Sequence, residues 1–244
     1  LKLKTATMPY STLFIYDLPS LQKISAETYL KSRYSKIDIL KPIIKREPNK
    51  KIQIGYYSAD FRNHATSHLM MKLLELHDKS KFELIGFSLN PIDKSNDEMY
   101  KRASSAFNQF IDVNSKSDKE IAQISRDLKI DIAVDLMGFT KLNRFGIFIE
   151  RCAPVQINYL GYPGTSGSDC MDYIIGDKII IPKENQKFFS EKIAYMPHTY
   201  QVNDSTKQIS KKIFTREKLG LPKDSFVFCC FNRNHKIIPE TFDL

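Results

Sequence analysis

The chain has 244 residues, enough for one large or two modest domains, and its 42% apolar and 11% aromatic content argues against wholesale disorder. No apolar run approaches the roughly 18 residues of a membrane span, and we recognise no signal peptide. The net charge of +9 lies at the two ends, because residues 51–205 carry nineteen Lys and Arg against twenty Asp and Glu. Clustered cations interleaved with aromatic residues are absent, so we expect no nucleic-acid partner.

The four cysteines show no paired metal-binding spacing. Cys229 and Cys230 are adjacent within an apolar run, which predicts buried thiols. A reducing, cytoplasmic location fits this cysteine usage best.

The first 50 residues predict a helical linker. Residues 20–35 carry apolar side chains at helical spacing after Ser20, a predicted cap, and a loose segment with Pro42 and Pro48 follows. From residue 51 strands alternate with helices. Strands are predicted at 51–59, 81–89, 109–113, 131–136, 155–160, 172–177 and 192–197, with helices at 66–77, 96–107 and 118–128. This alternation over residues 51–205 predicts a Rossmann-like parallel sheet covered by helices on both faces.

The alternation restarts in residues 206–244. A short helix at 215–220 with Gly220 as its stop, an apolar strand at 225–231 and a helix start at Pro239 predict the opening of a second α/β domain. Both ends of the chain look cut, so we expect a piece of a longer protein.

Polar or glycine-rich loops follow four of the predicted strands. They are residues 58–68, 137–144, 161–167 and 232–236. Because ligands of open parallel sheets bind at the carboxyl ends of strands, these loops predict a site at one edge.

Asp60 and His64 are the best-placed titratable pair. An Asp–His pair at a strand end can hold a proton near neutral pH or orient a hydroxyl, whereas a loop cap is the structural alternative for Asp60. His68 shares a helix face with His64, but a zinc site needs a further ligand, so a packed or capping role is the alternative for it. Lys236 precedes a helix start, where a cation can act on an anion, and a solvated lysine is its alternative.

Several cofactor signatures are missing. No phosphate-binding GxGxxG or GxxxxGK[ST] follows a strand, and there is no Asp-x-Asp pair of the kind that holds a diphosphate through a metal ion. The pattern therefore disfavours a dinucleotide oxidoreductase and a P-loop enzyme.

Five segments together resemble the protein O-linked N-acetylglucosamine transferase family, most closely its bacterial members. They are YYSADFRNHATSHLM, LGYPGTSG, MDYIIGD, SEKIAYMPHTY and FCCFNRNHKIIPETFDL, and they cover most of residues 51–244. The segment MPYSTLFIYDLPSLQKISAETYLKSRY is similar to the one that joins tetratricopeptide repeats to that family's catalytic region.

The resemblance implies a GT-B arrangement of two Rossmann-like domains, of which residues 51–205 are the N-terminal catalytic domain and residues 206–244 begin the C-terminal UDP-binding domain. It implies an inverting transfer of N-acetylglucosamine from UDP-N-acetylglucosamine to Ser or Thr hydroxyls of proteins, with no metal or other cofactor. A fragment of this kind is expected to be inactive alone.

The resemblance also assigns residues. Asp60, His64 and Lys236 resemble catalytic residues, with Lys236 on the diphosphate. The donor contacts implied are Thr66, Thr140, Leu160, Gly161, Pro163, Arg233 and His235. A side chain at Gly161 would, on this interpretation, crowd the donor. Arg233 and His235 stand where animal members have Gln and Tyr, so the uracil and ribose contacts are left open.

Two rival functions stay open. One is a GT-B sugar transferase with a glycan or small-molecule acceptor, and the other is a non-catalytic protein-binding module. The acceptor proteins, the group that accepts the hydroxyl proton and the oligomeric state are also left open.

Overall fold

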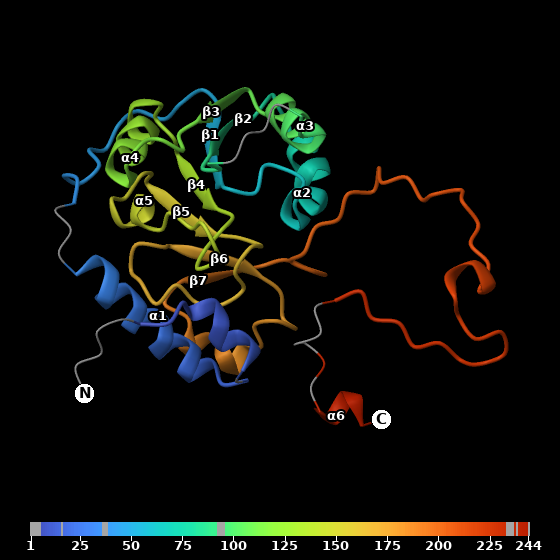
Figure 1. The fold of residues 1–244 in the computed structure, drawn as a ribbon. Helices are drawn as coiled ribbons and strands as arrows, with labels where there is room; N and C mark the ends of the chain where they lie inside the picture. The colour runs from blue at the N-terminus through green and yellow to red at the C-terminus, as the bar shows by residue number, and fades with distance from the viewer. Residues whose placement is uncertain are drawn as a thin grey trace. The chain divides into compact units, whose positions relative to one another are not determined.

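A seven-stranded parallel sheet lies at the centre of the fold (Figure 1). The computed structural model describes residues 6–15, 17–35, 39–91, 96–232, 237 and 239–243. The strands are β1 (Ile52–Ser58), β2 (Phe82–Ser88), β3 (Gln109–Asp112), β4 (Ile132–Asp135), β5 (Val155–Asn158), β6 (Tyr173–Gly176) and β7 (Lys192–Tyr195). The helices are η1 (Pro9–Phe14), α1 (Pro19–Tyr34), α2 (Ala65–Leu76), α3 (Glu98–Ala106), α4 (Asp118–Asp127), α5 (Gly146–Ile149), η2 (Lys183–Phe188), η3 (Glu217–Leu219) and α6 (Pro239–Phe242).

The strand order is β3-β2-β1-β4-β5-β6-β7, and every adjacent pair is parallel. This is the order of a doubly wound α/β sheet, in which the chain builds outward from β1 in one direction and then from β4 in the other. The register pairs Tyr57 with Asp135 and Asp135 with Asn158. The ends of β1, β4 and β5 are therefore level, and the predicted sheet of residues 51–205 is confirmed.

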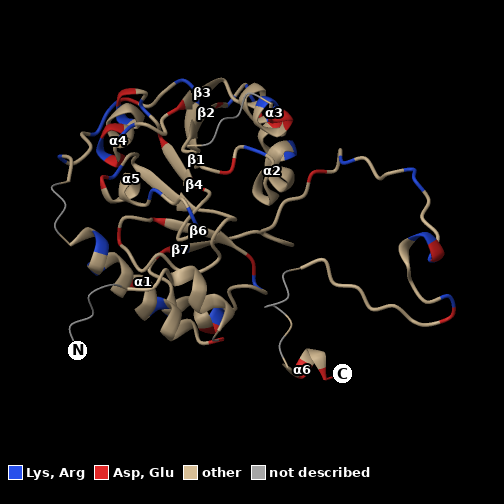
Figure 2. Ribbon diagram, in the orientation of Figure 1, with Lys and Arg blue, Asp and Glu red and all other residues tan. Residues whose placement is uncertain are grey.

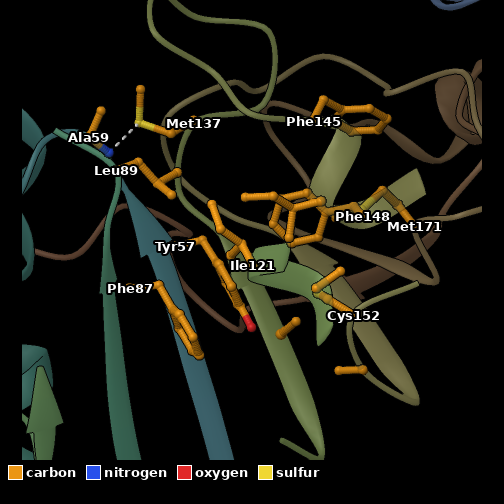
Figure 3. Packing of buried hydrophobic residues seen from close by; sticks show 14 of the residues in the cluster. Tyr57, Ala59, Phe87, Leu89, Ile121, Met137, Phe145, Phe148, Cys152 and Met171 are labelled. Atoms are coloured by element: carbon orange, nitrogen blue, oxygen red, sulfur yellow. Dashed lines mark hydrogen bonds between the residues drawn. The ribbon is translucent and has the colours of Figure 1, made fainter. Parts of the chain in front are cut away.

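The two faces of the sheet carry separate hydrophobic clusters, because successive strand side chains point to opposite faces. In β1, Ile54 and Tyr56 join the cluster under α2 and α3, whereas Tyr57 joins the one under α4 and α5. The Tyr57 ring stacks on Phe87 at 4.4 Å between centroids, as Figure 3 shows. Helices on both faces are therefore confirmed.

The N-terminal segment packs onto the sheet domain instead of standing apart as a linker. Ala26 and Tyr29 of α1 are buried in the α4 and α5 cluster. Beyond α1, the Arg46 guanidinium forms an ion pair with Asp131 at 2.8 Å. The predicted cap was wrong: α1 begins at Pro19, its N-cap is Leu18, and no side chain caps it. Proline at the first helical position replaces a side-chain cap because its missing N–H needs no partner.

Residues 206–244 form a second compact unit, distinct from residues 1–205. Here η3 ends at Gly220 with φ of +65°, so the predicted helix stop is confirmed. The predicted strand at 225–231 was wrong, since these residues are irregular and none of them belongs to a strand. A strand is stable only in a sheet, and the described part of this unit contains no partner strand. The predicted burial of Cys229 and Cys230 was also wrong, because both are exposed.

Charges of both signs mix on the outer faces of α3 and α4 (Figure 2). Each helix carries acidic and basic residues, for example Glu98 with Lys101 and Asp118 with Arg126. No helix within the described ranges is long and apolar enough to cross a membrane.

The thiols should separate into two reactivity classes. Burial raises the pKa of both Cys152 and Cys170 to about 12, so they stay protonated. Cys152 is buried and Cys170 half-buried, whereas Cys229 and Cys230 are exposed. We expect two thiols to react rapidly with a colorimetric disulfide reagent in the native chain and the other two only after denaturation. The double variant Cys229→Ser/Cys230→Ser should lose the fast phase. Four slow thiols in the reduced wild type would contradict the exposed tail.

Candidate active site

Two loops meet at the carboxyl edge of the sheet, at the point where its strand order reverses. They follow β1 and β4, and ligands of open parallel sheets bind at such a switch point. The backbone N–H of Ala59 donates to the sulfur of Met137 at 3.4 Å (Figure 3). The Leu136 N–H donates to the Tyr57 carbonyl at 3.1 Å. These bonds hold the two loops against each other.

Asp60 and His64 lie together between β1 and α2. His64 Nδ1 is 3.3 Å from Asp60 Oδ2 and 3.3 Å from the backbone nitrogen of Thr66. The His64 side chain is 38% exposed, whereas Asp60 is buried. An unprotonated Nδ1 accepts the Thr66 N–H and caps α2, while a protonated Nδ1 donates to the carboxylate. The pair can therefore hold a proton on an imidazole that solvent reaches.

The Asp60 carboxylate is held in a fixed position. The Asp60 backbone N–H donates to Ser58 Oγ at 2.9 Å, and Ser67 Oγ donates to the Asp60 backbone carbonyl at 2.5 Å. The Arg62 guanidinium donates to Oδ1 at 3.2 Å, so Oδ2 faces His64 while the other oxygen faces a cation. The contacts come from both sides of the loop, and they leave little freedom for the carboxylate to move away from the imidazole.

Asp97 fixes the middle of the same loop. It caps α3 by accepting the Met99 and Tyr100 N–H groups, and it accepts the Asn63 N–H at 2.7 Å. Although burial raises the pKa of Asp97, these backbone hydrogen bonds outweigh it and hold the pKa below its usual value. The segment before His64 is therefore tied to a second helix, a role that the sequence pattern did not indicate.

Asp135 organises the loop after β4. It is buried at the end of the strand and accepts the N–H groups of Met137 at 2.8 Å and Gly138 at 3.0 Å. Burial raises the pKa of Asp135 to about 6, against the lowering effect of these two bonds. In the same loop, Thr140 Oγ1 donates to the Met137 carbonyl at 2.8 Å. Thr140 is half-buried and directly follows this turn.

The loop after β5 carries backbone strain. Leu160 has φ of +67°, and the Gly161 N–H donates to the Tyr159 carbonyl at 2.9 Å, which closes a three-residue turn of the rare, strained kind. A Cβ at Gly161 would lie 2.0 Å from the Leu136 carbonyl oxygen. The absence of a side chain at Gly161 is thus required by packing against the β4 loop. Its predicted approach to a donor stays a prediction, as does that of the exposed Pro163.

Glu191 fixes the far end of the β5 loop. This buried carboxylate accepts the Thr165 hydroxyl at 2.7 Å and the Ser166 N–H at 2.6 Å. Sequence reasoning missed Asp97, Asp135 and Glu191. Asp97 and Glu191 accept the Asn63 and Ser166 N–H groups, which only the tertiary structure brings near, whereas the donors to Asp135 are its neighbours along the chain.

The structure brings Asp60, His64, Thr140 and Gly161 to one edge, since the strands before them are parallel neighbours with level ends. Thr66 lies in the first turn of α2, beside His64. Lys236, Arg233 and His235 lie outside the described residues, so their predicted contacts stay predictions.

One further feature lies away from this edge. A cavity of about 610 Å³ is lined by residues 42–48, Asp131, Arg151 and Pro154, which places it near the starts of β4 and β5. We assign the site by its chemistry, because the charged groups of that cavity are largely engaged, as in the Arg151–Asp172 pair at 2.8 Å. Across the described ranges, no group of three His, Cys, Asp or Glu side chains could hold a metal ion.

Comparison with known proteins agrees with this fold. The family described as Glycosyl transferase family 41 matches residues 34–214. The chain therefore belongs to glycosyl transferase family 41.

Curated relatives carry the same assignment. The chain is 38% identical over 204 residues to "Probable UDP-N-acetylglucosamine--peptide N-acetylglucosaminyltransferase SEC" of Arabidopsis thaliana, covering 81% of the chain and 21% of that protein. It is 37% identical over 183 residues to "UDP-N-acetylglucosamine--peptide N-acetylglucosaminyltransferase" of Caenorhabditis elegans, covering 72% and 15%. The chain thus spans about a fifth of the length of the curated relatives it matches.

A solved structure matches as well. It is described as "Thermobaculum terrenum O-GlcNAc transferase mutant - K341M", with a TM-score of 0.71 and 26% identity, and the match covers 79% of this chain and 37% of that one. The fold is therefore shared with the catalytic region of a bacterial O-GlcNAc transferase.

Asp135 should give the fold a recognisable pH dependence. Its pKa is raised in the folded state, so the folded chain binds this proton more tightly than the unfolded chain between about pH 4 and pH 6. The contribution of Asp135 to the free energy of unfolding is therefore greatest below about pH 4. It falls by about 3 kcal/mol as the pH rises through 6. We expect the difference in unfolding free energy between wild type and Asp135→Asn, from urea titrations, to follow that curve. A constant difference across this range would contradict the burial of a charged Asp135.

Gly161→Ala should lower stability with no nucleotide present. The added methyl group meets the Leu136 carbonyl, and such overpacking costs about 1–3 kcal/mol. We expect a lower melting temperature for Gly161→Ala, measured by circular dichroism, and a smaller change for Pro163→Ala, at an exposed position of the same loop. An unchanged melting temperature for Gly161→Ala would leave donor crowding as the better reason for this glycine.

Proposed function

We propose that the chain is part of an inverting glycosyltransferase that moves N-acetylglucosamine from UDP-N-acetylglucosamine to Ser or Thr hydroxyls of proteins. The names printed for the curated relatives support this donor and a peptide acceptor for those proteins. The observation that carries the proposal is the Asp60–His64 pair at the switch point of the sheet, where a ligand of this fold binds.

The reaction is a single displacement. The acceptor hydroxyl oxygen bonds to the anomeric carbon, the bond from that carbon to the diphosphate breaks, and UDP leaves with inversion. The hydroxyl proton has to leave the acceptor, and negative charge grows on the diphosphate. The protein's task is therefore to place two reactants and to stabilise that charge.

His64 and Asp60 serve the first task. The imidazole lies at the edge, is reached by solvent, and is oriented by the Thr66 N–H and the Asp60 carboxylate. If His64 takes the proton, Asp60 stabilises the imidazolium, and if it orients the donor, the same contacts fix the ring. Thr140 and the Leu160–Pro163 turn would border the sugar. We assign the second task to Lys236, with Arg233 and His235 toward the nucleotide, on sequence grounds alone.

The proposal also covers the setting of the enzyme. The chain would act within a longer protein with a second Rossmann-like domain and protein-docking repeats, in the cytoplasm and without a metal. The isolated chain would not catalyse transfer, because half of the nucleotide site would lie elsewhere.

The decisive experiment separates the two duties of His64. His64→Asn keeps a side-chain oxygen that can cap α2, whereas His64→Ala removes both cap and imidazole. In the complete enzyme, we expect both variants to lower kcat for transfer to a peptide by about a hundredfold or more. Only His64→Ala should also lose about 1 kcal/mol of stability.

His68→Ala is the matched control, because His68 lies one turn along the same helix and bonds to Asn63 at 2.8 Å. It should keep most activity. Wild-type turnover in His64→Asn would remove the imidazole from the mechanism. Transfer to a glycan but to no peptide would favour the rival acceptor class.

A further inference from the structure

Tyr162 is the buried centre of the β5 loop. Its side chain is 1% exposed, although Pro163 beside it is exposed. The ring lies 5.4 Å from the Phe139 ring, in the β4 loop, and 6.4 Å from the Tyr10 ring, in η1. One side chain thus contacts two segments that are distant from it in sequence.

Two glycines make room for this ring. A Cβ at Gly138 would lie 2.4 Å from Tyr162 Cβ, and a Cβ at Gly164 would lie 2.7 Å from the phenol end of the ring. The Gly138 approach, together with Gly161 against Leu136, packs the loop after β4 closely against the loop after β5. Real Cβ atoms do not approach so closely, so these positions have no room for a side chain.

Residues 9–15 and 17–34, which we call the N-terminal cover, pack on the same loops. Tyr29 of α1 lies 5.3 Å from Phe139, ring to ring. Ala26 and Glu27 lie against Gly167, where an added Cβ would approach both within about 3.1 Å. The cover therefore contacts the β4 loop, the middle of the β5 loop through Tyr10, and the end of the β5 loop.

The Tyr162 hydroxyl contributes no hydrogen bond to this arrangement. It is buried and has no partner among the described residues. Burial, and then the nearby Glu191, raise its pKa, so the phenol is neutral. The packing of the ring, and not its hydroxyl, makes the contact.

We propose that Tyr162 is a positioning residue that transmits the placement of the N-terminal cover to the Leu160–Pro163 turn. This inference rests on the proposed function for its effect on transfer, but not for its effect on the loop. The turn is strained at Leu160, so it holds its shape only where its surroundings fix it. Removing the ring or its Tyr10 support releases the turn, and a displacement of about 1 Å at a reacting centre costs about a hundredfold in rate.

The test compares four variants. Tyr162→Leu removes the ring, Tyr10→Ala removes its support from a half-buried position, and Tyr162→Phe removes only the hydroxyl. Tyr34→Ala is the matched control, because Tyr34 belongs to the same cover but packs on Phe145, 6.4 Å away ring to ring. Hydrogen exchange of residues 158–168 is measured in this chain, and kcat and donor KM in the complete enzyme.

We expect faster exchange of residues 158–168 and lower kcat for Tyr162→Leu and Tyr10→Ala. Wild-type exchange is expected for Tyr162→Phe, which keeps the ring, and both wild-type exchange and wild-type kcat are expected for Tyr34→Ala. Unchanged exchange in Tyr10→Ala together with Tyr162→Leu would overturn the inference, as would a Tyr162→Phe variant impaired as strongly as Tyr162→Leu. Faster exchange with no transferase activity in any protein, wild type included, would support the positioning inference while refuting the proposed function.

Discussion

The close approach of two loop backbones at Leu136 and Gly161 is the constraint on which this edge of the molecule depends. The level ends of β4 and β5 bring the loops together, and a Cβ at Gly161 would meet a carbonyl oxygen at 2.0 Å. This contact is between two backbones and contains no side chain that could adjust, so the position of each loop depends on that of the other. The strained Leu160 turn directly precedes this contact and the buried Tyr162 ring directly follows it, so the proposed site borders a closely packed pair of loops.

The sheet was predictable from sequence because its signal is local. Apolar runs of strand length separated by amphipathic helices fix element type, and the right-handed crossover rule then limits the topology. Asp60 and His64 were predictable for a related reason, since both lie in a polar loop that directly follows a buried strand. The short helices α5 and η2 were missed, because four to six residues are too few to show a period. The strand predicted at 225–231 was wrong for the opposite reason. These residues have the composition of a strand, but strand pairing depends on partners that composition does not reveal.

The residues that sequence reasoning could not reach share one property. Asp97, Asp135 and Glu191 each accept backbone N–H groups, and part of each set belongs to a loop that carries the site. For Asp97 and Glu191, the donors Asn63 and Ser166 come from segments distant in sequence, so only the tertiary structure reveals them. The donors to Asp135 are local, and they form a turn that the sequence pattern did not single out. Gly161 shows the converse, because its loop was recognised as special from the sequence, whereas the packing against this chain's own backbone that excludes a side chain there was not.

The Nδ1 atom of His64 serves both the cap of α2 and the pairing with Asp60. Nδ1 lies at equal distances from a helix N–H and from a carboxylate, and it cannot accept from the first and donate to the second at once. Protonation therefore exchanges the cap of α2 for an ion pair with Asp60. Because Asp60 is already held by Ser58, Ser67 and Arg62, that exchange needs no movement of the acid. An imidazole whose two protonation states are both supported by fixed partners suits a proton acceptor better than a purely structural cap, for which the carboxylate would be superfluous.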